Sequence, residues 1–185
     1  MPSQLDTLTQ INLNDLVSSF GWEKYPLLAA VLRRLFLAPA RKFAEQMVDV
    51  DNSVGQIGLV EASRKIMQKM YVRDVRVHGS ENIPKDEPAL FLSNHPGVAD
   101  TISLFAAINR PDLNIIAIHR PFLVSLVNVT RYLAYVSDDA AERMRAVRRI
   151  SAHLKNGSAA LTFPAGEIEP DPTVYPGALD SSTIG

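Results

Sequence analysis

Residues 89–108 read ALFLSNHPGVADTISLFAAI, and this stretch decides the fold. Four apolar residues are followed by a short polar turn, and then by apolar residues spaced as on one face of a helix. A strand that passes through a turn into a helix is one unit of an α/β sheet. The turn places His95 at the carboxyl end of the strand and Asp100 in the first turn of the helix, so the two side chains can converge.

His95 and Asp100 are therefore a candidate general base and its orienting partner. A neutral imidazole takes a proton from a hydroxyl or amine when its other nitrogen donates to a fixed acceptor, and a carboxylate can be that acceptor. The backbone amides of Gly97 and Val98, at the start of the helix, are candidate donors to a developing oxyanion. The alternatives are a His95 that only satisfies a backbone carbonyl and a Gly97 that only makes the turn.

A second stretch, AALTFPAGE at residues 159–167, repeats this arrangement: a short apolar strand runs into a turn that contains proline and glycine. Loops that leave the carboxyl ends of neighbouring parallel strands line one crevice. We therefore expect His95 and Gly166 to share a pocket.

The rest of the chain predicts an α/β fold, with a largely parallel sheet flanked by helices and a helical N-terminal segment. Further strands are expected at about 72–78, 114–118 and 132–136, and further helices at 54–71 and 140–155. Asp138 or Asp139 is the expected start of the last helix, and Asn156-Gly157 its end. We expect a helical region over residues 1–70 and an α/β domain over residues 71–185.

Residues 26–47 mix leucines with Arg33, Arg34, Arg41 and Lys42. The apolar run is shorter than the roughly 20 residues that cross a bilayer. Such a helix can lie on a membrane surface, where arginines meet the headgroups, or pack on the protein's own core. Both readings stay open from the sequence.

Composition excludes several classes of function. The 185 residues contain no cysteine, which removes disulfides, thiolate metal sites and a cysteine nucleophile. A Gly-x-Ser-x-Gly elbow, a phosphate-binding loop and a zinc finger are also absent from the sequence, and the net charge is −1. We expect no metal, no redox cofactor and no nucleic-acid partner. The polar first 14 residues are unlike a secretory signal, so we expect a cytoplasmic protein.

Three motifs taken together resemble a known family. Asn94-His95-x4-Asp100, an apolar segment near residues 132–136, and Phe163-Pro164-x-Gly166 resemble the glycerolipid acyltransferases, which include lysophosphatidic acid acyltransferase. The resemblance covers about residues 70–177. It implies that the histidine is the general base, that the aspartate orients it, and that the Phe-Pro-x-Gly loop helps hold the phosphate of the acceptor. Asn94 and Gly97 would shape the catalytic loop.

Two departures from the family pattern concern the acceptor site. Ala165, Glu167 and Ile168 stand where the family usually has glutamate, threonine and arginine, and residues 137–139 read SDD where the middle motif usually ends in arginine. Replacing these two arginines removes two side chains that could bind a phosphate bidentately. The Phe-Pro-Ala-Gly-Glu variant resembles a hemolysin-like branch of the family. Arg120 is a candidate replacement ligand, and a plain surface arginine is the alternative.

The resemblance predicts an enzyme of phospholipid biosynthesis that moves a fatty acyl group from acyl-CoA or acyl-carrier protein to a hydroxyl or amine of a lipid. It would work at the inner face of the membrane, with the thioester as co-substrate and no other cofactor. Phe163, Pro164, Gly166 and Glu167 would line the acceptor side. The alternatives are a hydrolase and a noncatalytic domain that binds membrane or carrier protein. Since the family continues beyond the second motif, we expect a chain that is incomplete at its C-terminus.

Overall fold

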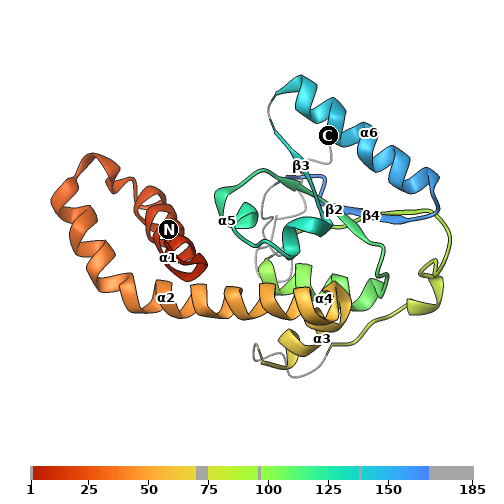
Figure 1. Cartoon of the computed structure of the whole chain (residues 1–185), viewed down its shortest axis with the longest axis horizontal. Helices are drawn as coiled ribbons and strands as arrows, with labels where there is room; N and C mark the ends of the chain where they lie inside the picture. The colour runs from red at the N-terminus through yellow and green to blue at the C-terminus, as the bar shows by residue number, and fades with distance from the viewer. Residues whose placement is uncertain (1, 70–74, 96, 138, 167–185) are drawn as a thin grey trace, which may run out of the picture. The chain divides into compact units, whose positions relative to one another are not determined.

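A computed structural model describes residues 2–69, 75–95, 97–137 and 139–166 (Figure 1). The chain divides into two compact units. Met1–Gln56 and Arg120–Arg131 form the first, which we call the helical unit, and Ile57–His119 and Tyr132–Gly185 form the second, the sheet unit. Each is described by itself. The boundary expected at residue 70 stays a prediction.

The helical unit contains α1 (Gln4–Ser19), the 3-10 turn η1 (Trp22–Lys24), most of α2 (Pro26–Ile57), α5 (Pro121–Val124) and most of η3 (Val129–Tyr132). Its apolar residues form two small cores. One contains Leu8, Ala44, Met47 and Leu126, and the other contains Val17, Ala29 and Leu32.

A buried carboxylate joins three segments of the helical unit. The side chain of Asp51 on α2 is 1% exposed. Its Oδ1 accepts the backbone amides of Asn128 and Val129 at 2.8 and 2.9 Å, and its Oδ2 accepts Nε2 of Gln4 at 3.0 Å. Charge-assisted bonds from backbone amides are the usual compensation for burying a carboxylate. Asp51 thereby fixes the segment 120–131 on α1 and α2.

The sheet unit is built on four parallel strands in the order β1-β4-β2-β3. Their bounds are Ala89–Leu92, Asn114–Ile118, Leu133–Val136 and Ala159–Thr162, in chain order. Between them lie α4 (Val98–Ile108) and α6 (Ala140–Lys155), and α3 (Leu59–Lys69) packs against α4. The alternation confirms the predicted α/β class, with a helical segment before a parallel sheet.

The strand order places helices on both faces of the sheet. The β1–α4–β2 connection steps in one direction and β3–α6–β4 steps back in the other, and right-handed crossovers of opposite direction put their helices on opposite faces. Figure 1 shows α6 on one face and α4 on the other. Ile150 of α6 packs on Ala134 and Ala160, all three buried. Strand β4, in the interior of the sheet, has Ala159, Ala160 and Leu161 at 0% exposure.

Most predicted elements of the sheet unit are confirmed, and two expectations are corrected. Helix α6 begins after Asp139, whose side chain accepts Glu142 N, and ends at Asn156. The helix expected at 54–71 is divided instead: α2 continues to Ile57, and α3 starts at Leu59. Gly58 lies between them with φ +80°, a left-handed conformation that glycine tolerates and that interrupts the helix. Residues 75–78 form no strand, and the rest of the strand expected at 72–78, residues 72–74, lies outside the described residues.

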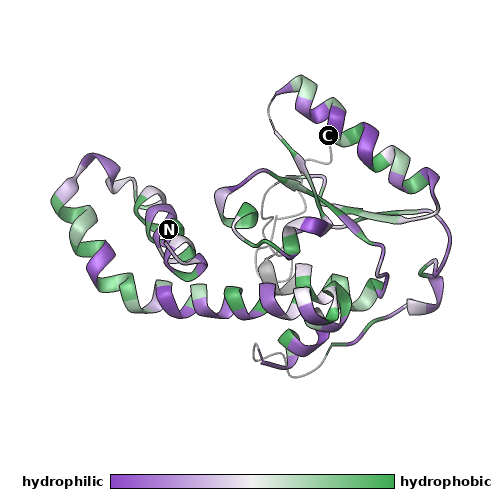
Figure 2. Ribbon diagram, in the orientation of Figure 1, coloured by the Kyte–Doolittle hydropathy of each residue, from purple (hydrophilic) through white to green (hydrophobic). Residues whose placement is uncertain are grey.

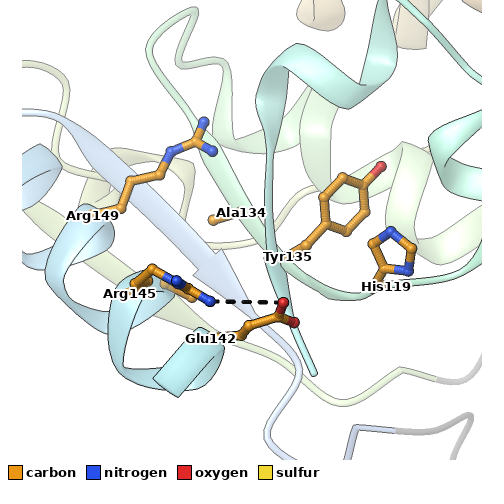
Figure 3. Close-up of a pocket in the computed structure, with 7 residues that line it drawn as sticks. His119, Ala134, Tyr135, Glu142, Arg145 and Arg149 are labelled. Atoms are coloured by element: carbon orange, nitrogen blue, oxygen red, sulfur yellow. Dashed lines mark ion pairs between the residues drawn. The ribbon is translucent and has the colours of Figure 1, made fainter. Parts of the chain in front are cut away.

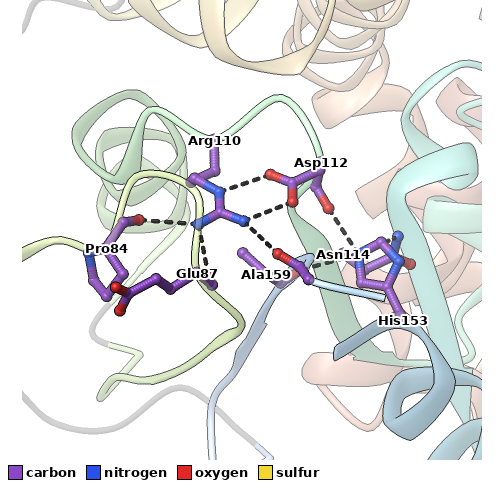
Figure 4. A network of polar contacts seen from close by, with 8 residues as sticks. Pro84, Glu87, Arg110, Asp112, Asn114, His153 and Ala159 are labelled. Carbon is purple, nitrogen blue, oxygen red and sulfur yellow. Dashed lines mark hydrogen bonds and ion pairs between the residues drawn. The ribbon is translucent and has the colours of Figure 1, made fainter. Parts of the chain in front are cut away.

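Arg110, after α4, is a buried tie between loops of the sheet unit (Figure 4). Its guanidinium makes two bonds to the carboxylate of Asp112, at 2.7 and 2.8 Å, and donates to the carbonyls of Pro84, Glu87 and Gly157 at 2.9–3.2 Å. The side chain is only 4% exposed. The five bonds use all five N–H donors of the guanidinium, so the buried charge of Arg110 is fully hydrogen-bonded.

Candidate functional site

Pairing of β1 with β4 brings the two sequence motifs together. The strands are parallel and in register, with Leu92 opposite Thr162. The next residue along, Ser93, continues the ladder by donating its amide to the carbonyl of Thr162 at 3.2 Å. His95 and Phe163 therefore leave the carboxyl ends of adjacent strands. Strand pairing thus brings the two motifs to the same end of the sheet. That His95 and Gly166 share a pocket stays a prediction.

The His95 imidazole is held between an aromatic ring and a hydroxyl. It stacks on Phe163, with 4.5 Å between ring centroids and 30° between ring planes. Its Nδ1 lies 3.2 Å from Oγ1 of Thr101, on the first turns of α4. The same hydroxyl lies 3.3 Å from the carbonyl oxygen of Gly97. These contacts hold the ring in place. Because the ring is only half-buried, part of it stays accessible.

The loop from β1 leads directly into α4. Gly97 is the N-terminal cap residue, with extended backbone, and its carbonyl accepts the Thr101 amide at 3.5 Å. The first backbone amides of a helix have no partner within that helix, so they are donors for a ligand. Asp100 lies in the first turn of α4, as expected. Its pairing with the imidazole stays a prediction.

The second motif forms a tight turn. The amide of Gly166 donates to the carbonyl of Phe163 at 3.0 Å, and Gly166 has φ +71°, which a residue with a side chain rarely adopts. A Cβ at Gly166 would meet Cδ1 of Ile118 at 3.9 Å, so this turn lies against the end of β2. Pro164 and Gly166 are exposed, in keeping with a surface that can meet a ligand.

The other predicted site residues are less closely placed. Asn94 is exposed beside His95 in the chain. Arg120 belongs to the helical unit, where it precedes α5, so its assignment to the site stays a prediction. Glu167 lies outside the described residues. Within the described ranges, no group of three histidine or carboxylate side chains is arranged to hold a metal ion.

Thr101 is the site residue that sequence reasoning missed. It was expected only as part of the helix that follows the turn. The available signal was its position: a residue four after Gly97 lies one helical turn beyond it, so its hydroxyl can reach back to the Gly97 carbonyl. The contact with the imidazole follows from where the loop turns, which the sequence pattern does not specify.

His95 and Phe163 lie at the carboxyl end of a parallel α/β sheet, and comparison with protein families identifies the chain as an enzyme of the transferase class. The family model described as Acyltransferase matches residues 74–181. The chain therefore belongs to the acyltransferase family, and the resemblance carried by its motifs is confirmed. Comparison with curated proteins and with solved structures gives no match. The family implies an acyl donor and a lipid acceptor.

Proposed function

We propose that this protein transfers a fatty acyl group from acyl-CoA or acyl-carrier protein to a hydroxyl or amine of a lipid or lipid precursor, with His95 as general base. The observation that carries the proposal is the imidazole of His95, stacked on Phe163 and touching Thr101 at the carboxyl end of the sheet. Membership of the acyltransferase family supports the reaction class.

We assign His95 the tautomer in which Nδ1 carries the proton and donates it to the hydroxyl of Thr101. A carbonyl oxygen can only accept, so when the single hydroxyl proton of Thr101 points to Gly97, the hydroxyl oxygen is left to accept from Nδ1–H. The lone pair then lies on Nε2, where a base needs it. In this proposal Asp100 shares the orienting role and stabilises the imidazolium once it forms.

The reaction proceeds without an acyl-enzyme. Nε2 of His95 takes the proton of the acceptor hydroxyl or amine while its oxygen or nitrogen bonds to the thioester carbonyl carbon. The carbonyl oxygen becomes an oxyanion, which the amides of Gly97 and the first turn of α4 stabilise; one such donor contributes roughly 3 kcal/mol. Collapse breaks the carbon–sulfur bond, and the imidazolium returns its proton to the leaving thiolate.

The acceptor is assigned to the side of the Phe163–Gly166 turn. Asn94, Pro164 and Gly166 are exposed there or beside His95 in the chain, and the family assigns this loop to the acceptor. We include Glu167 and Arg120 in the same role. Because the usual arginines are replaced in this sequence, we propose an acceptor other than a glycerol phosphate.

We also propose that the protein works on the inner face of a membrane. None of the described helices has the length and apolarity to span a bilayer. The first turns of α2 nevertheless carry a set of exposed large apolar residues, largely green in Figure 2: Leu27, Leu28, Val31, Leu35, Phe36 and Leu37. The exposed Arg33 and Arg34 lie among them and suit anionic headgroups.

The proposal is tested by incubating the protein with acyl-CoA or acyl-carrier protein, a lipid extract and vesicles. Released thiol is measured, and products are identified by mass spectrometry. An acylated lipid supports the transferase, and free fatty acid alone indicates a hydrolase. Binding of donor or vesicles without thiol release indicates the noncatalytic alternative. Since the chain has no cysteine, the protein contributes no thiol background.

Replacing Thr101 by valine is expected to lower kcat by about 3- to 10-fold, the value of one neutral hydrogen bond, with little change in KM. The pH profile of kcat/KM should shift as well, because the partner of Nδ1 changes. Thr101→Ser, which keeps the hydroxyl, is the matched control and should retain most of the activity. Equal losses of activity in T101V and T101S would contradict a positioning role for Thr101. So would an equally large effect of T101V in a protein whose His95 has already been replaced by alanine.

Val31→Glu is expected to weaken sedimentation with anionic vesicles by about tenfold, since it removes the burial of a valine and adds a repelled charge. The matched control is Val147→Glu on α6: the two valines are 53% and 52% exposed. V147E should sediment as the wild-type protein does. Equal effects of the two substitutions, or no binding of the unsubstituted chain, would remove the membrane assignment from α2.

A further inference from the structure

We infer that a cationic pocket beside β3 binds the phosphate of the acyl donor's phosphopantetheine arm. The pocket, of about 400 Å³, lies in the sheet unit and is lined by His119, Ala134, Tyr135, Glu142, Arg145, Ala146 and Arg149 (Figure 3). Its volume is within the usual range for small-molecule sites. This inference rests on the proposed function, because it names where that reaction's donor is held.

The charges in the pocket favour an anion. Arg145 and Arg149 are one helical turn apart on α6, so they point to the same side of the helix. Glu142 is the one carboxylate among the lining residues. It is already held, by Arg145 at 3.7 Å and by the hydroxyl of Ser137 at 2.6 Å. Within the described part of the chain, Arg149 has no carboxylate partner. A guanidinium fork of this kind is suited to bidentate binding of phosphate.

The floor and the opposite wall give the pocket its shape. Ala134 on β3 and Ala146 on α6 are buried and small, which leaves room between strand and helix. His119 and Tyr135 form the other wall, their rings in an edge-to-face contact at 5.3 Å. In Figure 3 the two arginines lie on one side of β3 and these rings on the other. The phosphate is therefore assigned to the arginine side.

The distance to His95 selects the donor over the acceptor. Strands β4 and β2 separate β1, which carries the catalytic loop, from β3. Three strand spacings amount to about 14 Å. In a glycerol phosphate acceptor the reacting hydroxyl is only a few bonds from the phosphate, too close to span this gap. In a phosphopantetheine thioester, the long pantetheine arm separates the reacting carbonyl from the phosphate.

We assign that arm to the carboxyl end of the sheet, where the residues between the pocket and His95 lie. His119, which lines the pocket, directly follows Ile118, the last residue of β2. Ile118 in turn lies against Gly166, in the turn that begins at Phe163, and Phe163 stacks on His95. These contacts form a continuous series from the pocket to the base.

The test compares two donors with the same arm: an acyl-phosphopantetheine and the acyl-pantetheine that lacks the phosphate. In the unsubstituted protein, KM should be about tenfold lower for the phosphorylated donor, the value of a charge-assisted contact. Arg149→Gln should raise that KM about tenfold, leave kcat unchanged and have no effect on acyl-pantetheine. Arg148→Gln is the matched control, because Arg148 is also an exposed arginine of α6 but does not line the pocket.

Two further measurements distinguish failure of the phosphate pocket from failure of the proposed reaction. Acyl-CoA and acyl-carrier protein both carry this phosphate, and the donor for which R149Q loses more activity is the natural source. Calorimetric titration with CoA alone needs no turnover. Loss of CoA binding in R149Q, with no acyl transfer to any lipid, would retain the pocket and reject the proposed reaction. Equal CoA binding in R149Q and R148Q, or a KM effect only on a phosphorylated acceptor, would overturn the inference.

Discussion

His95→Ala is expected to lower the rate of thiol release by about 10²- to 10⁴-fold, the usual contribution of a general base. The ring is half-buried between Phe163 and Thr101, so its removal takes away the proton acceptor and little of the core. Donor affinity should change little, because the phosphate is held elsewhere in our proposal. The loss should therefore appear in kcat, measured with saturating acyl-CoA and an excess of lipid acceptor.

Two controls make this result specific. His78→Ala replaces an exposed histidine outside the two motifs, and its activity should equal that of the unsubstituted chain. Free imidazole, added to H95A, can occupy the space of the missing ring and should restore part of the rate. Circular dichroism should show the same melting curve for both variants. If H95A keeps more than a third of the activity while folded, His95 is not the base.

Arg110→Ala should have the largest effect on stability. Removing the guanidinium leaves the carboxylate of Asp112 without its ion-pair partner and takes away the Arg110 donor from three backbone carbonyls. Breaking a buried ion pair costs roughly 3–5 kcal/mol, and we expect about 3 because Asp112 is 34% exposed and can be partly solvated. For a chain of this size that lowers Tm by about 6 to 12 °C. Thermal denaturation followed by circular dichroism measures it.

The same pair predicts a dependence on pH. Hydrogen bonds from Arg110 lower the pKa of Asp112 below its ordinary value of 3.8. A carboxyl with a lowered pKa in the folded state stabilises the protein above the unfolded-state pKa, and this contribution is lost as the pH falls through the folded-state value. Below about pH 4, the stability of R110A should therefore fall less with pH than that of the unsubstituted chain. Arg148→Ala, at an exposed arginine, should change neither the Tm nor the slope.

The sequence predicted most accurately those helices and strands whose ends are marked by a local signal. Asp139 accepts the amide of Glu142, and Gly157 has φ +89°, so both limits of α6 follow from residues that cap helices. The strands of the sheet were recognised because each is a short apolar run bounded by turn residues. For the same reason the two strand-end motifs could be assigned to one location.

Long-range features could not be predicted in this way. The periodicity from Leu59 to Tyr71 is the same whether or not the helix extends back through Gly58, so the break there was missed. The segment 120–131 joins the helical unit through the carboxylate of Asp51, a partner about 77 positions away. Arg110 likewise binds carbonyls from loops 23 to 47 positions distant. The short windows of sequence from which helices and strands are recognised do not contain both members of such pairs.

The position of β4 has a consequence for folding during synthesis. This strand inserts between β1 and β2, although it is translated some 40 residues after β2. Translation proceeds at roughly 5–20 residues per second, so β4 is synthesised several seconds after β2. During this time the backbone groups of β1 and β2 that will pair with β4 have no partner strand. The sheet cannot close, and Phe163 cannot reach His95, until residue 163 has left the ribosome. If His95 acts as we propose, the nascent chain is inactive during that interval, and its unpaired strands are then most exposed to aggregation or chaperone capture.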